Sequence, residues 1–380
     1  MSYRRDWEAV ISFLARERTV AGPGFNRWLI PPAALLVHLC IGEIYAFSVF
    51  KTPLVERFGT GLTPIGIIFS ISIVMLGLSA AVFGTWVERA GPRAAMFTAA
   101  LCWSSGFFIG ALGVATTQLW LVYLGYGLIG GIGLGIGYIS PVSTLIKWFP
   151  DRPGLATGLA IMGFGGGALI ASPLTDRLLT AYASNPVDAI VPSFLTLGVI
   201  YLIAMMIGAF VVRLPPEDWQ PEGWTPPTEE ETSDLETTAN VSADSAIRTP
   251  QFWLLWTVLF CNVTAGIGLL EQAAPMIQDF FAVTAAAAAG FVGLLSLANM
   301  AGRIGWSATS DYIGRKPIYM VYLGVGTVMY FLLATFGSAS LALFLLVTVV
   351  ILSFYGGGVA TIPAYLKDHQ TLTGVVALFS

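Results

Sequence analysis

Ten apolar runs dominate this sequence, and each has the roughly 20 residues that a helix needs to cross a bilayer. A helix suits such a segment because all of its backbone hydrogen bonds are made internally. Hydrophobic residues make up 56% of the chain and charged residues 11%, whereas soluble domains carry about a quarter charged residues. The sequence therefore predicts an all-α, polytopic membrane protein. We place the spans near residues 28–50, 65–87, 94–115, 118–145, 154–176, 190–212, 252–275, 284–308, 317–337 and 341–365.

Composition also limits the chemistry and the partners. The net charge is −4 and no large basic block is present, which argues against a nucleic-acid partner. Cys40, Cys102 and Cys261 lie in apolar runs, as buried small side chains do, so neither disulfides nor a metal site is indicated. With two histidines and no HExxH or CxxC motif, we expect no metal, no cofactor and no enzymatic reaction. The partner that composition predicts is the lipid bilayer.

Basic residues are distributed unequally between the two sides of the membrane. With the N-terminus in the cytoplasm, fourteen lysines and arginines fall on the cytoplasmic side and three on the outer side. Cytoplasmic loops are enriched in lysine and arginine. We therefore predict a multi-pass protein of the cell (cytoplasmic or inner) membrane with a cytoplasmic N-terminus.

One long polar stretch divides the chain. Residues 213–248 contain nine acidic residues and are rich in proline, a composition typical of flexible linkers. The linker separates a cytoplasmic tail (1–27) and a six-helix half (28–212) from a second part with four spans (249–380).

Matching loops indicate an internal repeat. GTWVERAGPR (84–93) follows the second span and SATSDYIGRK (307–316) follows the eighth, with acid, glycine and base at the same offsets. The fourth and tenth spans each end in a Gly-to-Pro stretch followed by a lysine, Lys147 or Lys367. A six-span unit used twice in parallel explains both matches. Only thirteen residues follow Lys367, so we expect the second unit to lack its last two spans.

Two sets of residues resemble known families. The paired Gly/Ser-x-x-x-acid…Gly-x-basic loops resemble the signature loop of the major facilitator superfamily. Longer stretches also resemble the oxalate/formate antiporter family, relatives of the monocarboxylate transporters. They are NRWLIPPAALLVHLCIGEIY (26–45), WFPDRPGLATGLAIMGFGGGALI (148–170), PPEDWQPEGW (215–224) and TPQFWLLWTVLFCNVTAGIG (249–268). The resemblance implies a major facilitator bundle, here with a six-helix N-terminal half and four helices of the C-terminal half.

Arg303 is a charged residue inside the eighth apolar run, and Asn299 lies one helical turn before it. An arginine at membrane depth usually faces a cavity or a partner, and its planar guanidinium can grip a carboxylate through two hydrogen bonds. A snorkelling or structurally paired arginine is the alternative, and the residues alone do not decide. The family resemblance implies that Arg303 binds an anionic substrate, which Asn299 helps to orient. It also implies aromatic cavity walls, for which Tyr138 and Tyr355 are candidates beside ordinary packing.

Three ionisable residues in equivalent spans are candidates for proton coupling. Glu43 and His38 lie in the first span and Glu271 in the seventh. A carboxylate would repel an anionic substrate unless it were protonated, so we do not expect Glu43 to be a direct ligand. Hydrogen-bonded packing is the alternative for His38, and a gate or an exposed helix end is the alternative for Glu271.

Charged residues in the two matching loops could bridge helices and hold one access state. These candidate latch residues are Glu88, Arg89, Arg93, Asp311, Arg315 and Lys316. The second copy is degraded, because Tyr312 stands where the first copy has Arg89.

We therefore expect a secondary active transporter of small organic anions that works by alternating access. The substrate would be a monocarboxylate such as formate or lactate, or oxalate in exchange for formate, with a proton or a counter-anion as coupling partner. The resemblance implies a second basic residue in the eleventh span, which is absent here, so a dianion would lack one counter-charge. The alternative is a truncated, non-transporting remnant or a membrane scaffold.

Overall fold

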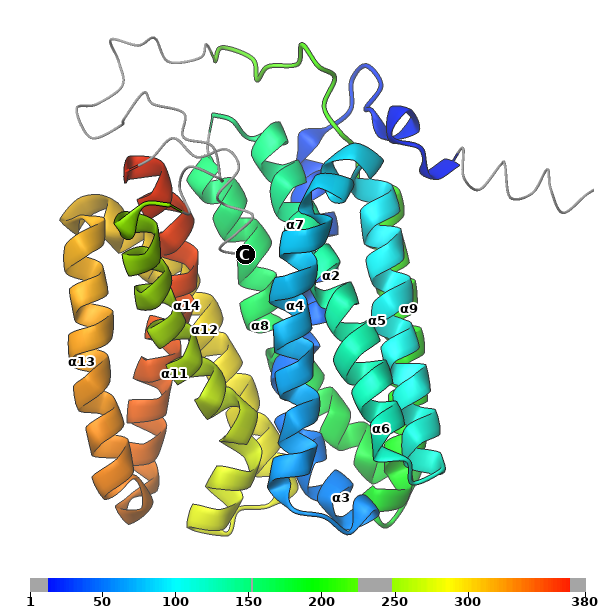
Figure 1. Cartoon of the computed structure of the whole chain (residues 1–380), viewed down its shortest axis with the longest axis vertical. Helices are drawn as coiled ribbons and strands as arrows, with labels where there is room; N and C mark the ends of the chain where they lie inside the picture. Colours follow the sequence, from blue (N-terminus) through cyan, green and yellow to red (C-terminus); the bar gives the residue numbers. More distant parts are fainter. Residues whose placement is uncertain (1–12, 152, 225–247, 370–380) are drawn as a thin grey trace, which may run out of the picture.

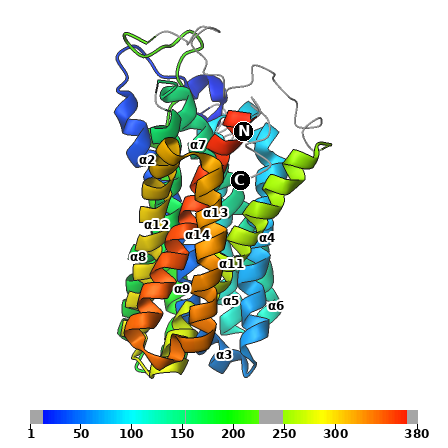
Figure 2. The ribbon, with the colours of Figure 1, turned by 90° about the vertical axis from the view of Figure 1, so that its left-hand side faces the viewer.

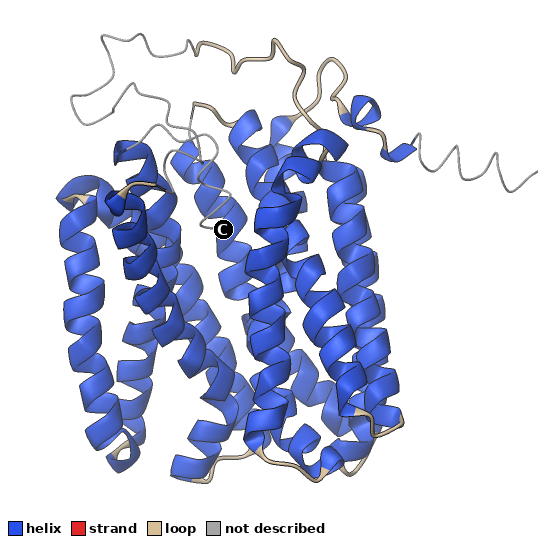
Figure 3. Ribbon diagram, viewed as in Figure 1, coloured by secondary structure: helices blue, strands red, loops and turns tan. Residues whose placement is uncertain are grey.

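The computed structural model describes residues 13–151, 153–224 and 248–369, which are almost entirely helical (Figure 3). Ten helices in this part of the chain are long and apolar enough to cross a membrane, which confirms the predicted spans. The first half contains α2 (Ile30–Ile41), α3 (Ser48–Phe58), α4 (Leu62–Ala90), α5 (Pro92–Ala115), α6 (Leu119–Val122), α7 (Gly130–Trp148), α8 (Pro153–Tyr182) and α9 (Pro186–Val211). The second half contains α11 (Pro250–Phe281), α12 (Ala285–Ile313), α13 (Arg315–Phe336) and α14 (Leu341–His369).

The two halves stand side by side, and α8 of the first packs along α12 of the second (Figure 1). All the long helices run roughly along one axis (Figure 2). Residues 13–27 and the start of the linker lie at one end, which we call the linker end, and α3 lies at the opposite end, the α3 end. The halves approach each other at the α3 end and diverge toward the linker end.

Two of the spans are not regular α-helices. The first consists of α2 and α3 joined by a 3-10 segment, Gly42–Ala46. The fourth contains a π-helical segment, Tyr123–Ile129, between α6 and α7. Such turns change the angular spacing of side chains along a helix, so the face of each residue cannot be read from a regular helical period.

The matching loops of the repeat have the same backbone geometry. Gly91 ends α4 with φ 86° and ψ 164°, and Gly314 ends α12 with φ 89° and ψ 155°. This region favours glycine, which explains why a glycine occupies the same offset in both loops. The next helix begins immediately after each glycine, as expected of two copies of one unit.

The halves differ in how far their helices are covered. In the first half α8 and α9 pack on α2 and α5, and 72% and 56% of the apolar stretches of the first and third spans are buried. In the corresponding helices of the second half, α11 and α13, 22% of the apolar stretch is buried. No helix of the described residues stands where α8 and α9 stand in the first half. Large apolar side chains are therefore exposed there, among them Trp253, Leu254, Phe260, Met320 and Phe331.

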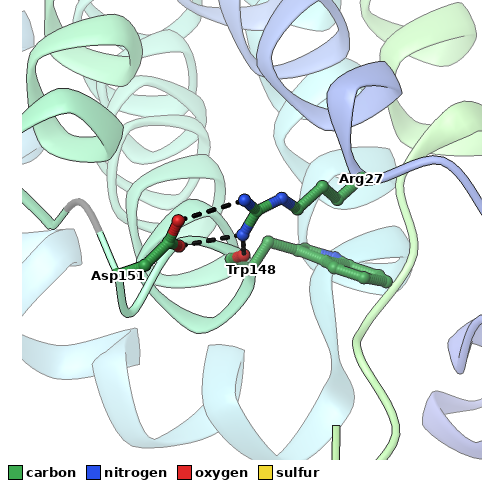
Figure 4. Close-up of polar contacts among 3 residues, drawn as sticks. All are labelled: Arg27, Trp148 and Asp151. Atoms are coloured by element: carbon green, nitrogen blue, oxygen red, sulfur yellow. Dashed lines mark hydrogen bonds and ion pairs between the residues drawn. The ribbon is translucent and has the colours of Figure 1, made fainter. Parts of the chain in front are cut away.

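Arg27 joins three stretches that are far apart in the sequence. Its guanidinium donates to the two carboxylate oxygens of Asp151 at 2.8 and 3.0 Å, and to the Trp148 carbonyl oxygen at 3.1 Å (Figure 4). The guanidinium carbon lies 4.7 Å from the centroid of the Phe149 ring and 5.7 Å from that of Trp219. We call these five residues the Arg27 clasp. Three of the stretches that carry the family resemblance thus form one cluster at the linker end.

The clasp fixes the start of the predicted linker on the first half. Leu214 and Val20 form a parallel β-bridge, and the ring of Trp219 packs edge-on against Trp148 with centroids 4.7 Å apart. The predicted flexibility is therefore wrong for the part of the linker that precedes 225–247. That range lies outside the described residues.

We expect Arg27→Lys to lower the midpoint of thermal unfolding in detergent by about 3–5 °C. Lysine keeps the charge but cannot form the two-point contact with Asp151 or stack on the rings, and a hydrogen bond to a charged group contributes about 1.5–3 kcal/mol. The matched control is Arg248→Lys, at an exposed arginine, which should leave the midpoint unchanged. Equal midpoints for the two variants would show that the clasp does not stabilise the first half.

Candidate binding site

Arg303 lies within α12 and is 1% exposed. Its Nε donates to the Asn299 amide oxygen at 3.1 Å, and its Nη1 donates to the backbone carbonyl of Ile161, on α8 of the other half, at 3.1 Å. The Phe164 ring, also on α8, has its centroid 5.8 Å from the guanidinium carbon. No acidic side chain of the described residues forms an ion pair with Arg303. A buried charge without a counter-ion is costly, so this cation is a natural site for an anion.

Glycines on α8 make room for the arginine. A Cβ at Gly165 would lie 2.7 Å from Arg303 Nε, which is too close for any other residue to fit without a shift. Ser296 on α12 donates to the Gly165 carbonyl oxygen at 2.7 Å. Side chains of α12 therefore lie directly against the backbone of α8, as the glycine run 163–167 allows. This approach places Arg303 at the contact between the halves.

Aromatic side chains from four spans gather around Arg303. Tyr355 from α14 and Tyr45 from the 3-10 segment share a hydrogen bond between their hydroxyls at 2.6 Å. The Phe164 ring packs against Tyr45 with centroids 5.0 Å apart and against Tyr138 at 5.2 Å. The structure thus brings all four predicted substrate-binding residues into one cluster between the halves.

Two members of the cluster, Tyr45 and Phe164, were missed by the sequence analysis. Tyr45 follows Gly42 by three residues, and residues three apart share a face of a 3-10 helix. A Cβ at Gly42 would lie 2.4 Å from the Phe164 carbonyl oxygen, so this face is pressed against α8. Phe164 is the single large side chain in the run GFGGG at 163–167, a signal that could have marked it as a residue presented at a close helix contact.

Two hydrogen-bond donors at the centre of the cluster have no partner in the described residues. Asn299 Nδ2 is buried and unpaired, and Arg303 Nη2 makes no hydrogen bond there, since the arginine donates through Nε and Nη1. Buried polar groups are nearly always paired in folded proteins. These donors therefore suit a ligand that only accepts hydrogen bonds, and a carboxylate meets that requirement while balancing the charge.

His38 is fully buried beside the cluster. Its Nε2 donates to the Tyr138 backbone carbonyl at 3.0 Å, while Nδ1 is unpaired. In the second half, Asn262 Nδ2 donates to the Phe354 carbonyl at 3.4 Å, so a polar side chain ties the first span to the fourth in both halves. This contact is the packing role considered for His38, and its role as a proton relay stays a prediction.

The two acidic candidates for proton coupling lie in different places. Glu43 is fully buried in the first half, where the Tyr126 hydroxyl donates to its Oε2 at 3.0 Å. Glu271 lies toward the α3 end and forms an ion pair with Lys51 of the other half. A Cβ at Gly66 would lie 2.6 Å from Glu271 Oε1, so the pair is pressed against α4. Glu271 therefore joins the halves, which fits a gate.

Charged residues of the first matching loop bind within their own half. Glu88 forms an ion pair with Lys147 and accepts a hydrogen bond from Ser143. Arg93 donates to the Phe13 carbonyl oxygen at 2.9 Å. Bridging between helices is thus observed, but between α4 and α7 of one half.

The charged side chains of the second matching loop form no ion pair with a described residue of the first half. Arg315 donates to the Ser310 hydroxyl, and Lys316 is exposed, as Arg89 is in the first copy. The Asp311 side chain lies outside the described residues. A latch between the two halves therefore stays a prediction.

Comparison with known proteins agrees with this architecture. The family model of the Major Facilitator Superfamily matches residues 33–378, so the chain belongs to that superfamily of membrane transporters, which are not enzymes. It is 27% identical over 345 residues to the oxalate:formate antiporter of Oxalobacter formigenes, covering 90% of this chain and 77% of that protein. It is 28% identical over 157 residues to monocarboxylate transporter 13 of Bos taurus, covering 41% and 36% of the two chains.

Solved structures show the same fold. A bacterial homologue of the human lysosomal transporter Spinster, in an inward-facing and unoccupied conformation, superposes with a TM-score of 0.64 at 18% identity. The match covers 94% of this chain and 81% of that one. The inward-open xylose transporter of E. coli superposes with a TM-score of 0.62 at 15% identity, covering 90% and 82%.

We expect Glu271→Gln to increase the population in which the halves separate at the α3 end by about tenfold. Removing one partner of a largely buried ion pair leaves the other charge unpaired, and a tenfold change in population corresponds to about 1.4 kcal/mol. Spin labels on cysteines replacing Glu56 and Asp279, exposed residues of α3 and α11, would report the distance in a background without native cysteines. Lys316→Gln, at an exposed lysine of the linker end, is the control. Identical distance distributions in both variants would exclude Lys51–Glu271 as a gate.

Proposed function

We propose that this chain is a secondary active transporter of small organic anions that works by alternating access. The observation that carries the proposal is Arg303, a buried cation at the contact between the halves without an acidic ion-pair partner among the described residues. Its Nη2 and the Asn299 Nδ2 are hydrogen-bond donors that have no acceptor among the described residues. A site between two repeat units can open to either side when the units rock, which is what a transported ligand requires.

We propose a monocarboxylate, such as formate or lactate, as the substrate class. Arg303 is the single cationic side chain in the described cluster, and one cation balances one carboxylate. A dianion such as oxalate would bring a second charge into a buried site at considerable cost. The names of the relatives, an oxalate:formate antiporter and a monocarboxylate transporter, support small carboxylates in general, with oxalate–formate exchange as the rival.

We propose further that the linker end faces the cytoplasm of a cell membrane. The excess of basic residues at that end, fourteen against three in the sequence, supports this orientation. The α3 end then faces outward, and the Lys51–Glu271 pair closes the outer side of the site. The halves diverge toward the linker end (Figure 1), which suits an inward-facing state. Transport would proceed by breaking the Lys51–Glu271 pair while a contact forms between the matching loops.

One observation favours a second candidate function. Most of the apolar surface of α11 and α13 is not covered by other described residues. A chain in this form could be a membrane scaffold or a non-transporting remnant of a transporter. Exchange of labelled formate or lactate by proteoliposomes that contain the 380-residue chain distinguishes the two candidates. Exchange above the level of protein-free liposomes supports the transporter, and its absence supports the scaffold.

We expect Arg303→Lys to weaken carboxylate binding by about 10- to 100-fold, because charge-assisted hydrogen bonds contribute about 1.5–3 kcal/mol. Lysine retains the charge but loses the planar fork, and Arg303→Ala should abolish exchange. Asn299→Ala removes a single neutral donor and should cost about tenfold or less. The concentration dependence of counterflow exchange measures each effect, with Arg248→Ala as the exposed control. Unchanged exchange in Arg303→Ala would refute the site.

Substrate charge provides an independent check on the same site. We expect unlabelled formate or lactate to inhibit exchange at concentrations at least about tenfold below those of oxalate, because the second oxalate charge has no counter-ion in the described cluster. Competition against a labelled monocarboxylate at neutral pH measures this ratio. Stronger inhibition by oxalate would favour oxalate–formate exchange.

A further inference from the structure

A cavity lies between α11, α13 and α14 in the second half. Its volume is about 250 Å³, and its lining includes the exposed residues Cys261 of α11 and Thr327 of α13. A cavity of about 150 Å³ can hold one benzene molecule, so this one has room for about ten carbon atoms. Most of the apolar surface of α11 and α13 is not covered by other described residues. The mouth of the cavity between these two helices therefore faces the bilayer.

The internal repeat shows why this space is empty. Trp103 lies twelve residues after Gly91, and Gly326 lies twelve residues after Gly314, so the two positions are equivalent on α5 and α13. In the first half the Trp103 ring is fully buried, and its Nε1 donates to a carbonyl oxygen of α2 at 3.2 Å. A Cβ added at Gly326 would meet only Phe354 Cδ2 among the described residues, at 3.9 Å. The second half therefore has a space where the first half has an indole ring.

Contacts between helices close the cavity along the helix axes. On the side of the α3 end, the Tyr330 hydroxyl of α13 donates to the Ala265 carbonyl oxygen of α11 at 2.6 Å. On the side of the linker end, Leu259 of α11 and Tyr322 of α13 belong to one packed apolar cluster that also contains Phe354. A ligand therefore enters from the side, between α11 and α13.

The cavity lies close to the middle of the membrane. Gly326 is eleven residues after Arg315, the first residue of α13, which is about 16 Å along a helix. The hydrocarbon core of a bilayer is about 30 Å thick. The mouth of the cavity is therefore near the midplane, where the ends of lipid acyl chains lie.

The lining favours an apolar occupant. No charged side chain of the described residues lines the cavity. The hydroxyls of Thr327 and Tyr330 donate to backbone carbonyl oxygens at 2.7 and 2.6 Å, and Asn262 Nδ2 donates to the Phe354 carbonyl oxygen at 3.4 Å. Asn262 Oδ1 is unpaired, but it lies beside Gly358 of α14, which is not part of the lining. Hydrocarbon can therefore fill the cavity without leaving a donor of these side chains unpaired.

Tyr355 connects the cavity with the candidate binding site. Its side chain lines the cavity, and its hydroxyl shares a hydrogen bond with Tyr45. A Cβ at Gly266 would lie 2.3 Å from Tyr355 Cγ, so the ring rests directly on the backbone of α11. An occupant of the cavity therefore packs against the same side chain that belongs to the cluster around Arg303.

We propose that the cavity binds the terminal part of one acyl chain of a membrane phospholipid. The chain enters between α11 and α13 and fills the space that Trp103 fills in the first half. It gives the walls packing partners that an empty cavity would lack. It also holds the Tyr355 ring where its hydroxyl reaches Tyr45. The effect of the chain on substrate binding rests on the proposed function, whereas the acyl-chain site itself does not.

Photolabelling tests the site in proteoliposomes of the 380-residue chain, with a phospholipid that carries a diazirine near the end of one acyl chain. We expect at least about threefold more label on the cavity-lining segments of α11 and α13 than at Val199 and Ile200, exposed residues halfway along α9. Gly326→Trp should lower the label to the α9 level, because the indole fills the cavity. Gly324→Trp, where an added Cβ meets nothing within 4 Å, should leave the label unchanged.

A second variant keeps this test independent of whether the tryptophan variant folds. Gly326→Leu fills less of the cavity and should lower the label by a smaller amount. Wild-type label no higher than that on α9 would overturn the site, and this is the result expected if a helix of another protein or a small aromatic molecule occupied the cavity. Unchanged label in the Gly326 variants would overturn it as well.

Exchange of the labelled monocarboxylate tests the effect on Tyr355. Methyl-branched phytanoyl chains are wider than straight chains and fit the cavity less well. In phytanoyl lipid we expect the wild type to need at least about threefold more substrate for half-maximal exchange than in straight-chain lipid. Gly326→Trp should not respond to the lipid, and Gly324→Trp should respond as the wild type does. An equal response of Gly326→Trp would overturn the support of Tyr355. A wild type without exchange in either lipid refutes the proposed function, and photolabelling alone then decides the acyl-chain site.

Discussion

The hydrogen bond from the Arg303 guanidinium to the Ile161 carbonyl is the contact on which the arrangement of the site depends. It crosses from α12 to α8 and can form because Gly165 has no side chain in the way. A backbone carbonyl offers a partial charge, not a full one, so the bond holds the arginine without neutralising it. Among the described residues, the interface between the halves therefore contains an unbalanced positive charge, which an anion would balance.

The ion pairs at the linker end join residues of the same half, whereas the ion pair at the α3 end joins the two halves. At the linker end the Arg27 clasp and the Glu88–Lys147 pair lie within the first half. At the α3 end Lys51 pairs with Glu271 across the interface. Pairs inside a half move with it and keep it rigid, while a pair between halves must break when they separate. The distribution therefore favours a hinge-like motion in which the α3 end opens and the first half moves as one body.

Periodicity and composition predicted the ten spans, and the i, i+4 spacing placed Asn299 beside Arg303. Ion-pair partners on different helices were not predicted, because Lys51 and Glu271 are distant in the sequence and no local pattern pairs them. Tyr45 was not predicted for another reason: the 3-10 segment Gly42–Ala46 interrupts the regular α-helical spacing of side chains. The acidic linker was expected to be flexible throughout, yet Trp219 anchors its start against Trp148, and one aromatic contact outweighs a polar composition there.

The position of Glu43 keeps an acid away from the guanidinium of Arg303. If an acid faced Arg303 directly, the two would form an ion pair and occupy the place that we propose for a substrate carboxylate. The 3-10 turn presents Tyr45 to the cluster and directs Glu43 into the aromatic interior of the first half. The acid is thereby near enough to be moved with Tyr45 but cannot compete for the guanidinium. In a regular α-helix positions 42 and 45 would be offset by about 60° around the axis, whereas the 3-10 turn stacks them directly, so that Gly42 and Tyr45 both contact α8.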